Sequence, residues 1–237
     1  MGLGIAKGDA GALRKEGRRL SRRAGGKQGP GRSAIFPKPR PCPVVYHRAM
    51  PIRALAWDWI GRPGHEDLVL DDGPDGIEAA GDVAASLDGA PFRLRYRLAC
   101  DKEWRFRSAS LSIEAATPLA CHIARAPDGA WRVNESPRPD LAGASAIDIM
   151  ATPLTNTLPI RTLPFHPDMP IPITVAYIAV PSLAVTAETQ EYTLLSSGRF
   201  RYHGLATRFT AELEVDSNGL VLRYGDIWRR AGGLCPA

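Results

Sequence analysis

The chain has 237 residues, of which 44% are hydrophobic, and a formal net charge of +5 at pH 7. Residues 1–49 hold twelve of the 30 Lys and Arg residues but only two of the 25 Asp and Glu residues, so residues 50–237 carry about −5. The basic charge therefore belongs to the first 49 residues, and specific nucleic-acid binding is not expected. No run of about 18 apolar residues occurs, so no transmembrane helix is expected.

Residues 1–49 are predicted to be a disordered basic extension. Gly and Pro are frequent there and the aromatic residues are Phe36 and Tyr46, so the segment has too little apolar surface to offset the entropy lost on folding. Strand-like sequence begins directly after Met50. A translation start at Met50 is one explanation of the extension, and charge-driven contact with anionic surfaces is another. A folded domain is predicted over residues 50–230, followed by a flexible tail over residues 231–237.

The four cysteines predict neither a zinc site nor a disulfide framework. Cys42, Cys100, Cys121 and Cys235 have no CxxC spacing, and two of them lie in the predicted tails. No phosphate-binding glycine loop, HExxH motif or GxSxG motif occurs in the chain. We therefore expect a cytoplasmic protein that has no metal and no cofactor.

Short stretches of alternating apolar and polar residues follow one another from residue 54 onward, as in β-strands. The first predicted strands are residues 54–60, 67–70, 77–87, 92–99, 104–113, 119–124 and 131–133. The alternation is clearest in residues 92–99, where arginines occupy one face and Phe92, Leu94, Tyr96 and Leu98 the other. Turn signals at residues 71–74, 88–89 and 127–129 separate these strands.

Beyond a central stretch, strands are predicted at residues 171–180, 190–195, 199–203, 207–215 and 220–224. Ser217-Asn218-Gly219 marks a tight turn, and residues 181–184 give the one slight helical signal. Short strands with turn signals at this density predict an all-β, mainly antiparallel roll or barrel.

The central stretch, residues 146–163, has the sequence AIDIMATPLTNTLPIRTL. Pro153 and Pro159 each remove a backbone donor and fix φ, so we expect an extended, kinked backbone here rather than a helix. The stretch combines apolar anchors with hydrogen-bonding side chains, which suits the wall of a cavity better than a solvent loop. An ordinary strand corner with satisfied polar groups is the other interpretation.

Residues 148–161, DIMATPLTNTLPIR, resemble the signature of a bacterial family of proposed glycolipid-binding proteins. Further matching pieces occur in order at Trp57, Trp59, His65-Glu66, Tyr96-Arg97-Leu98, Trp104, Asp128-Gly129-Ala130-Trp131, Ala176-Tyr177-Ile178, Gln190-Glu191-Tyr192 and Val215-Asp216. The resemblance covers residues 51–224. It implies a single curled β-roll or half-barrel domain of the spiral type, with a cavity for a lipid or glycolipid.

Arg161 is the strongest single candidate for ligand binding. Its guanidinium could clamp a phosphate, a carboxylate or sugar hydroxyls, or it could form a structural ion pair with Asp148 or Glu66. Thr155, Asn156 and Thr157 could bond a polar head group, or they could cap backbone groups left unpaired by the prolines.

Four other residues complete the candidate set. Gln190 and Tyr192 alternate with Glu191 and so share a strand face, where they could bond a ligand hydroxyl or simply each other. Glu66 precedes a predicted strand and could point inward, whereas the neighbouring His65 is expected at the surface. Trp57 could line a cup, although aromatic residues on one strand face commonly pack in a core.

Two functions fit these residues. The first is non-catalytic binding of a lipid or glycolipid-like amphipathic ligand by the eight candidates Arg161, Asn156, Thr155, Thr157, Gln190, Tyr192, Glu66 and Trp57. The alternative is a hydrolase or isomerase acting on a glycosidic or acyl substrate, with Glu66 and Asp148 as the acid/base pair. That chemistry needs a suitable separation of the carboxyl groups and one desolvated member with a raised pKa.

Overall fold

A computed structural model describes residues 52–114 and 117–232. The predicted extension over residues 1–49 and most of the predicted tail lie outside the described residues. Three short helical segments are present in the described part: η1 (Pro139–Leu141), η2 (Leu154–Asn156) and α1 (Thr157–Thr162). None of the described helices is long and apolar enough to cross a membrane.

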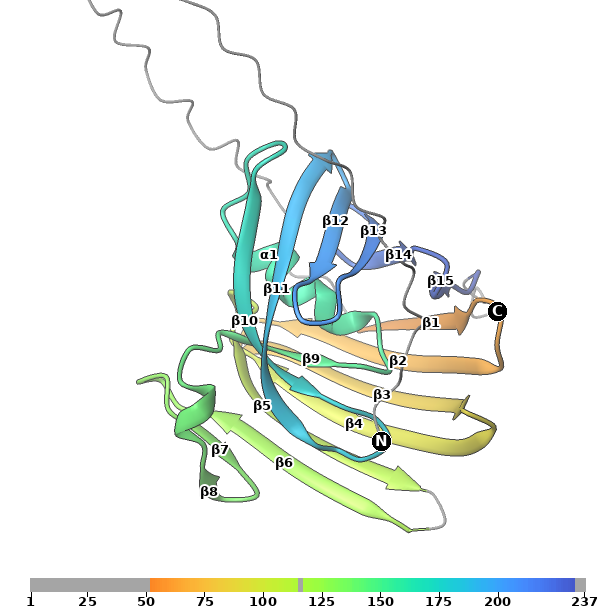
Figure 1. Ribbon diagram of the computed structural model, residues 1–237, viewed down its shortest axis with the longest axis vertical. Coiled ribbons are helices and arrows are strands. Elements are labelled where there is room, and N and C mark those ends of the chain that lie inside the picture. The colour runs from red at the N-terminus through yellow and green to blue at the C-terminus, as the bar shows by residue number, and fades with distance from the viewer. Residues whose placement is uncertain (1–51, 115–116, 233–237) are drawn as a thin grey trace, which may run out of the picture. The chain divides into compact units, whose positions relative to one another are not determined.

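The described strands form one large curled sheet (Figure 1). They are β1 (Arg53–Trp59), β2 (Gly64–Gly73), β3 (Gly76–Leu87), β4 (Ala90–Cys100), β5 (Phe106–Glu114), β6 (Leu119–Arg125), β7 (Trp131–Val133), β8 (Ser136–Pro137), β9 (Ala146–Ile149), β10 (Pro170–Ile178), β11 (Val185–Ser196), β12 (Arg199–Gly204), β13 (Phe209–Val215), β14 (Val221–Tyr224) and β15 (Trp228–Arg230).

The strand order shows how the sheet is wound. It runs β8-β7-β6-β5-β4-β3-β2-β1-β15-β14-β13-β12-β11-β10-β9, so β1 joins two meanders and β8 and β9 are left as free edges. Neighbouring strands are antiparallel except for β9 and β10, which are parallel. The all-β, mainly antiparallel and curled fold predicted from the sequence is confirmed.

The alternation of apolar and polar residues along a strand determines which side chains face the core and which face solvent. In β4, Phe92, Leu94, Tyr96 and Leu98 are buried while the arginines between them are exposed, as predicted. The Asp88-Gly89 turn that precedes β4 has φ values of 50° and 80°, which match the left-handed turns that tight hairpins favour.

The two ends of the described region meet at the β1–β15 pair. Trp59 lies opposite Trp228 in the register, and their ring centroids are 4.9 Å apart. The sequence did not predict β15, because a three-residue strand such as Trp228–Arg230 is too short to show alternation. The pair buries both indole rings and joins the halves of the sheet.

The central stretch is helical after β9, so the prediction of an extended, kinked backbone there was wrong. Pro153 precedes η2, and Pro159 is the third residue of α1. The first backbone N–H groups of a helix have no intrahelical partner, so a proline in the first turn costs no hydrogen bond. Because η2 and α1 are so short, both prolines fall where a helix tolerates them.

Two smaller predictions also need correction. Residues 71–73 belong to β2 rather than to a turn, which leaves a tighter connection to β3. No helix forms at residues 181–184, where Val180-Pro181 is a cis peptide bond. The turns predicted at residues 127–129 and 217–219 are present, with Gly129 and Gly219 at φ values of 91° and 76°.

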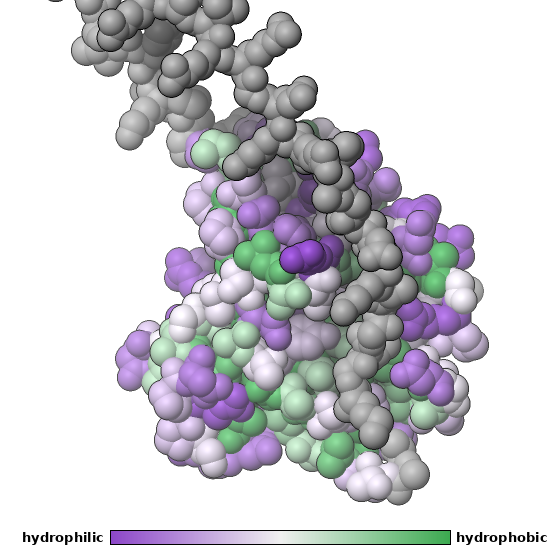
Figure 2. Space-filling model, viewed as in Figure 1, coloured by the Kyte–Doolittle hydropathy of each residue, from purple (hydrophilic) through white to green (hydrophobic). Residues whose placement is uncertain are grey.

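The short helices η2 and α1 lie inside the curl of the sheet (Figure 1), and large apolar side chains form the core. Leu154, Leu158 and Ile160 are each 1% exposed. Four tryptophans are fully buried against the same core: Trp57, Trp104, Trp131 and Trp228. We call residues 152–161, from Thr152 to Arg161, the inner segment. On the face seen in Figure 2, apolar residues reach the surface mainly in the middle and polar residues mainly toward the outline.

Candidate ligand-binding site

Glu66 on β2 points into the protein and joins the sheet to the inner segment. Its side chain is 0% exposed. Tyr96 Oη donates a hydrogen bond to Glu66 Oε1 at 2.5 Å, and Thr152 Oγ1 donates to the same oxygen at 2.8 Å. Glu66 Oε2 is buried and has no hydrogen-bond partner among the described residues. Burial raises the pKa of Glu66 to about 8, although both hydroxyl donors oppose that shift.

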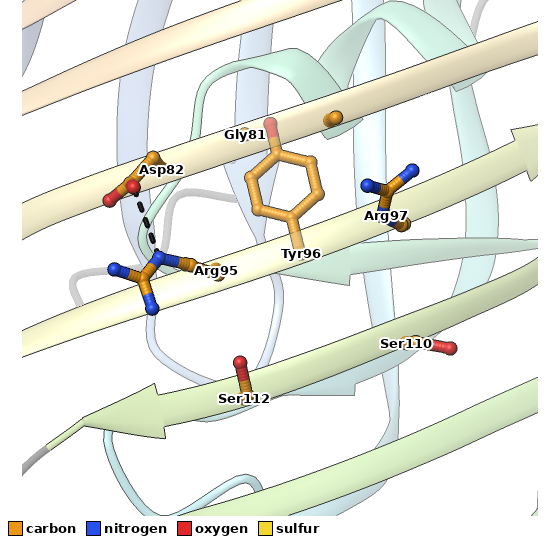
Figure 3. A pocket seen from close by; sticks show the side chains of 8 residues that line it. Gly81, Asp82, Arg95, Tyr96, Arg97, Ser110 and Ser112 are labelled. Atoms are coloured by element: carbon orange, nitrogen blue, oxygen red, sulfur yellow. Dashed lines mark hydrogen bonds and ion pairs between the residues drawn. The ribbon is translucent and has the colours of Figure 1, made fainter.

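Tyr96 reaches Glu66 across β3 because Gly81 leaves room for its ring (Figure 3). A Cβ atom on Gly81 would lie 2.2 Å from Tyr96 Cε1 and 2.6 Å from Tyr96 Oη. No side chain other than hydrogen fits beneath the ring at that position. Gly81 therefore allows a residue of β4 to hydrogen-bond with a residue of β2.

Asp148 on β9 anchors a second polar network. Thr155 Oγ1 donates to Asp148 Oδ1 at 3.1 Å, and Gln190 Nε2 donates to Oδ2 at 2.5 Å. Asp148 remains partly exposed. Its surroundings nevertheless remove enough water that burial raises its pKa, against the effect of the Gln190 and Thr155 hydrogen bonds.

Tyr192 ties β11 to the same network. Tyr192 Oη donates to Asn156 Oδ1 at 2.9 Å, and Asn156 Nδ2 donates to the carbonyl oxygen of Pro153 at 3.3 Å. Tyr192 Oη also donates to Gln190 Oε1 at 3.4 Å, so one network joins Asp148 to Thr155, Asn156, Gln190 and Tyr192, all predicted as ligand-binding residues. Asn156 also caps backbone next to a proline, which is the structural role that the sequence left open.

Four tyrosines, Tyr177, Tyr192, Tyr202 and Tyr224, surround this network, and we call them the tyrosine cluster. Burial raises the pKa of each of them most strongly, and the negative charge of Asp148 raises it further. For Tyr177, which lies opposite Asp148 in the β9–β10 register, the pKa rises to about 12. All four hydroxyl groups are therefore within electrostatic reach of one carboxylate.

The rings beside the tyrosine cluster form an aromatic patch that is partly open to solvent. Tyr202 contacts Phe209 and Tyr224 with centroid distances of 6.0 and 5.8 Å, and Phe209 is 6.3 Å from Tyr224. Phe209 is 39% exposed. Among the described residues, none forms a hydrogen bond with the hydroxyl group of Tyr177, Tyr202 or Tyr224. These three oxygen atoms are also absent from the buried polar atoms that have no partner, so each of them reaches solvent. The three hydroxyls are therefore available to solvent or to a ligand.

The remaining candidates lie elsewhere. Arg161 Nη1 donates to the carbonyl oxygen of Asn218 at 2.6 Å, and its guanidinium lies 4.5 Å from the ring centroid of Trp104. Trp57 is fully buried and donates to the carbonyl oxygen of Val221. Thr157 Oγ1 is buried without a partner among the described residues. The sequence left open an ion pair between Arg161 and Asp148 or Glu66. Neither pair occurs among the described residues.

We predict that Arg161→Ala destabilises the protein by about 1–3 kcal/mol, because it removes a charge-assisted hydrogen bond and a cation–π contact. Urea unfolding followed by Trp fluorescence measures this. Arg201→Ala, an exposed residue of β12, is the control and should change stability by less than about 0.5 kcal/mol. Equal stability of the two variants would show that Arg161 does not fasten the inner segment.

His65 is a surface residue, as expected. Its Nδ1 lies 2.7 Å from Asp58 Oδ1, and that hydrogen bond raises the pKa of His65. No group of three or more His, Cys, Asp or Glu side chains suited to a metal ion occurs in the described part of the chain. Cys100 and Cys121 are free and buried.

Two hollows of about 420 and 400 Å³ lie on the outer face of β3, β4 and β5, over small side chains. Figure 3 shows the first, with Arg95 and Arg97 at its edge and Ser110 and Ser112 on the next strand. None of the eight residues predicted to bind a ligand lines either hollow. The inner cavity that the resemblance implied stays a prediction.

Sequence reasoning missed the tyrosine cluster apart from Tyr192. Tyr177, Tyr202 and Tyr224 lie in strands that were predicted, so the alternation could have placed them on inner faces. Bringing β9, β10, β12 and β14 together requires the strand order, which local alternation does not give. Tyr96 was placed on the inner face, but its bond to Glu66 depends on Gly81, whose role no local pattern indicates.

Comparisons with known proteins agree with this architecture. A crystal structure of a DUF1089 family protein from Pseudomonas aeruginosa is similar, with a TM-score of 0.64 and 30% sequence identity over 70% of this chain and 92% of that chain. No curated protein matches the chain. A family model described as "Putative glycolipid-binding" matches residues 54–230. Because this match spans nearly all of the described sheet, the chain belongs to the family of that name.

Proposed function

We propose that the protein binds a lipid or glycolipid-like amphipathic ligand without catalysing a reaction, and that the polar head group sits at Asp148 and the tyrosine cluster. The observation that carries the proposal is the partly exposed carboxylate of Asp148 beside tyrosines whose hydroxyls have no hydrogen-bond partner among the described residues. Tyr177 lies opposite Asp148 in the β9–β10 register, and Tyr202 contacts both Tyr192 and Tyr224. A few convergent polar groups in aromatic surroundings are typical of small-molecule sites.

The position of exposed apolar side chains supports an amphipathic ligand. Leu205 and Phe209 are 42% and 39% exposed at the end of the β12–β13 hairpin. Leu205 N–H donates to the carbonyl oxygen of Thr189, one residue before Gln190. Apolar surface therefore begins directly beside the polar network, where the chain of a lipid would continue from its head group. The family description of glycolipid binding agrees with this proposal.

Asp148 and Gln190 would act as acceptor and donor toward ligand hydroxyls. Gln190 Nε2 already donates a hydrogen bond to Asp148 Oδ2 at 2.5 Å. A carboxylate has about four lone-pair sites, so Asp148 can still accept hydrogen bonds from a ligand. Thr155 and Asn156 would hold these groups in place rather than contact the ligand themselves. The cytoplasmic location predicted from the sequence stays a prediction.

Native mass spectrometry on the full chain, combined with organic extraction, tests the proposal. We expect a co-purifying mass of lipid size that is weakened at least tenfold in Tyr202→Ala. Glu214→Gln, on the outer face of β13, is the matched control and should keep the ligand. A clean apo mass that stays unchanged across panels of lipids and glycolipids would contradict the proposal.

The enzymatic alternative retains one supporting observation, the raised pKa of both Glu66 and Asp148. A raised pKa suits a general acid. Glu66 is 0% exposed, however, so a substrate could reach it only if the inner segment moved. Turnover of any glycosidic or acyl substrate by the unaltered chain, abolished in a Glu66→Gln variant that still folds, would favour the alternative over binding alone.

A further inference from the structure

Three arginines of β4 share the outer face of the sheet but differ in their partners. Arg93 donates to both carboxylate oxygens of Asp82, at 2.6 Å each. Arg95 donates to Asp82 Oδ2 at 3.2 Å and also pairs with Glu114. The side chain of Arg97 forms no ion pair or hydrogen bond with another residue in the described part of the chain. Arg97 is therefore the one cation of this row that keeps its charge unbalanced.

Arg97 lies where the two hollows on the outer face of the sheet meet. The hollows, of about 420 and 400 Å³, have Ala80, Arg97 and Ser110 in common. Ala80 on β3 and Ser110 on β5 lie opposite Arg97 in the register, one on each side. Their small side chains leave the space around the guanidinium open. An unbalanced cation thus borders a space large enough for a small molecule.

The charges of the larger hollow favour an anion. Its lining includes two arginines, Arg95 and Arg97, and one carboxylate, Asp82, so the lining carries a net charge of +1. Asp82 is already hydrogen-bonded to Arg93 and Arg95, and the bond from Arg93 lowers its pKa. The smaller hollow includes Arg97 and Glu78 and is neutral. An anionic group therefore gains most in the larger hollow, beside Arg97.

Hydroxyl groups on the neighbouring strand complete a donor set for a phosphate. Ser110 and Ser112 of β5 line the larger hollow next to Arg97 (Figure 3). Ser110 Oγ lies 3.1 Å from His122 Nδ1 on β6. The backbone N–H and carbonyl of His122 each bond to Asn134 at 2.8 Å, which fixes the position of His122. A guanidinium binds two phosphate oxygens at once, and the remaining oxygen can accept from a hydroxyl.

We propose that the outer face of the sheet binds a phosphate ester of a small hydroxylated compound, such as glycerol or a sugar. The phosphate lies in the larger hollow and accepts hydrogen bonds from Arg97, Ser110 and Ser112. The rest of the molecule extends into the smaller hollow, where Glu78 and Ser108 can bond its hydroxyl groups. No residue of the ligand site proposed above lines either hollow. This second site therefore does not depend on the proposed function.

NMR on the full chain labelled at histidine tests this, because His122 contacts Ser110 and reports on the site. At constant pH and a physiological salt concentration, the ring signals of His122 should shift and saturate on titration with glycerol 3-phosphate. Glycerol, which lacks the phosphate, should leave them unchanged. Inorganic phosphate should bind at least about threefold more weakly than the ester, because it does not reach the smaller hollow. His203 of β12 lines neither hollow and is the internal reference.

Variants at exposed positions locate the effect without disturbing the core. Arg97→Ala should weaken binding of glycerol 3-phosphate at least about tenfold, and Ser112→Ala about threefold. Arg201→Ala, which removes an exposed arginine that lines neither hollow, should change it less than about twofold. An unmoved His122 signal, unchanged binding in Arg97→Ala or an equal loss in Arg201→Ala would overturn the site. Inorganic phosphate that binds as tightly as glycerol 3-phosphate would overturn the assignment to an ester.

Discussion

Replacing Glu66 with glutamine should make the protein more stable than the unaltered chain at pH 8. Burial raises the pKa of Glu66 from 4.5 to about 8. The folded protein therefore holds a proton on Glu66 that the unfolded chain has already lost above pH 5. Glutamine keeps an oxygen that accepts from Tyr96 and Thr152 but has no proton to lose.

The sign of the pH dependence follows from linkage. Because the pKa is raised on folding, the stability contributed by the proton is fully present below pH 4.5 and is lost as pH rises through about 8. The unaltered chain should lose on the order of 3 kcal/mol of unfolding free energy between pH 5 and pH 8 from this group. Asp148, whose pKa is also raised, acts in the same direction.

Urea unfolding of both chains at pH 5, 6.5 and 8 measures this difference. The stability gap between Glu66→Gln and the unaltered chain should widen with pH, and Glu78→Gln, at an exposed position of β3, should show no such gap. Both proteins contain the same histidines, so the effect of histidine titration on stability cancels when the two are compared at the same pH. A gap that stays constant from pH 5 to pH 8 would mean that Glu66 is ionised in the folded protein.

Gly81→Ala should destabilise the protein by about 3 kcal/mol, because the added methyl group overlaps a buried ring. The new Cβ would lie 2.2 Å from Tyr96 Cε1 and 2.3 Å from Tyr96 Cζ. Tyr96 cannot move aside without leaving Glu66, whose buried carboxyl would then lose its shortest hydrogen bond. Thermal or urea unfolding measures the loss.

A double-mutant cycle shows whether the loss acts through Tyr96. In a Tyr96→Ala background the ring is absent, so Gly81→Ala should then cost less than about 1 kcal/mol. Gly143→Ala is the control, since no atom lies within 4 Å of its added Cβ. If Gly81→Ala is still strongly destabilising in the Tyr96→Ala background, the overlap between the added methyl group and the Tyr96 ring is not the cause.

Much of the fold follows from local sequence because strand faces alternate with a period of two. The buried set of β4 and the turns at Asp88-Gly89 and Gly219 were all accessible from short patterns. The helix at Thr157–Thr162 was not, because the rule against proline in helices does not apply in a first turn, and this helix is shorter than two turns. The pairing of β15 with β1, which joins the two halves of the sheet, also left no local signal.

The candidate site was predictable only in part, for a different reason. Thr155, Asn156, Gln190 and Tyr192 were chosen as polar groups with the potential to face inward. Thr155 and Gln190 do bond to Asp148, and Tyr192 bonds to both Gln190 and Asn156. Arg161 shares the same motif, but it contacts Trp104 and Asn218, because successive residues of a helix point in different directions. Tyr202 lies opposite Tyr192 in the β11–β12 hairpin, whereas Tyr177 and Tyr224 join the site only through the order of the strands in the sheet.

The measurement that tests the ligand site most directly is NMR on protein labelled at tyrosine, titrated with the lipid fraction extracted from the purified chain. We expect shifts for Tyr177, Tyr202 and Tyr224, whereas Tyr96, held beside Glu66 in the interior, should stay unchanged. Shifts confined to Tyr96, or shifts that Tyr202→Ala leaves undiminished for the rest of the tyrosine cluster, would place the ligand elsewhere and contradict the account.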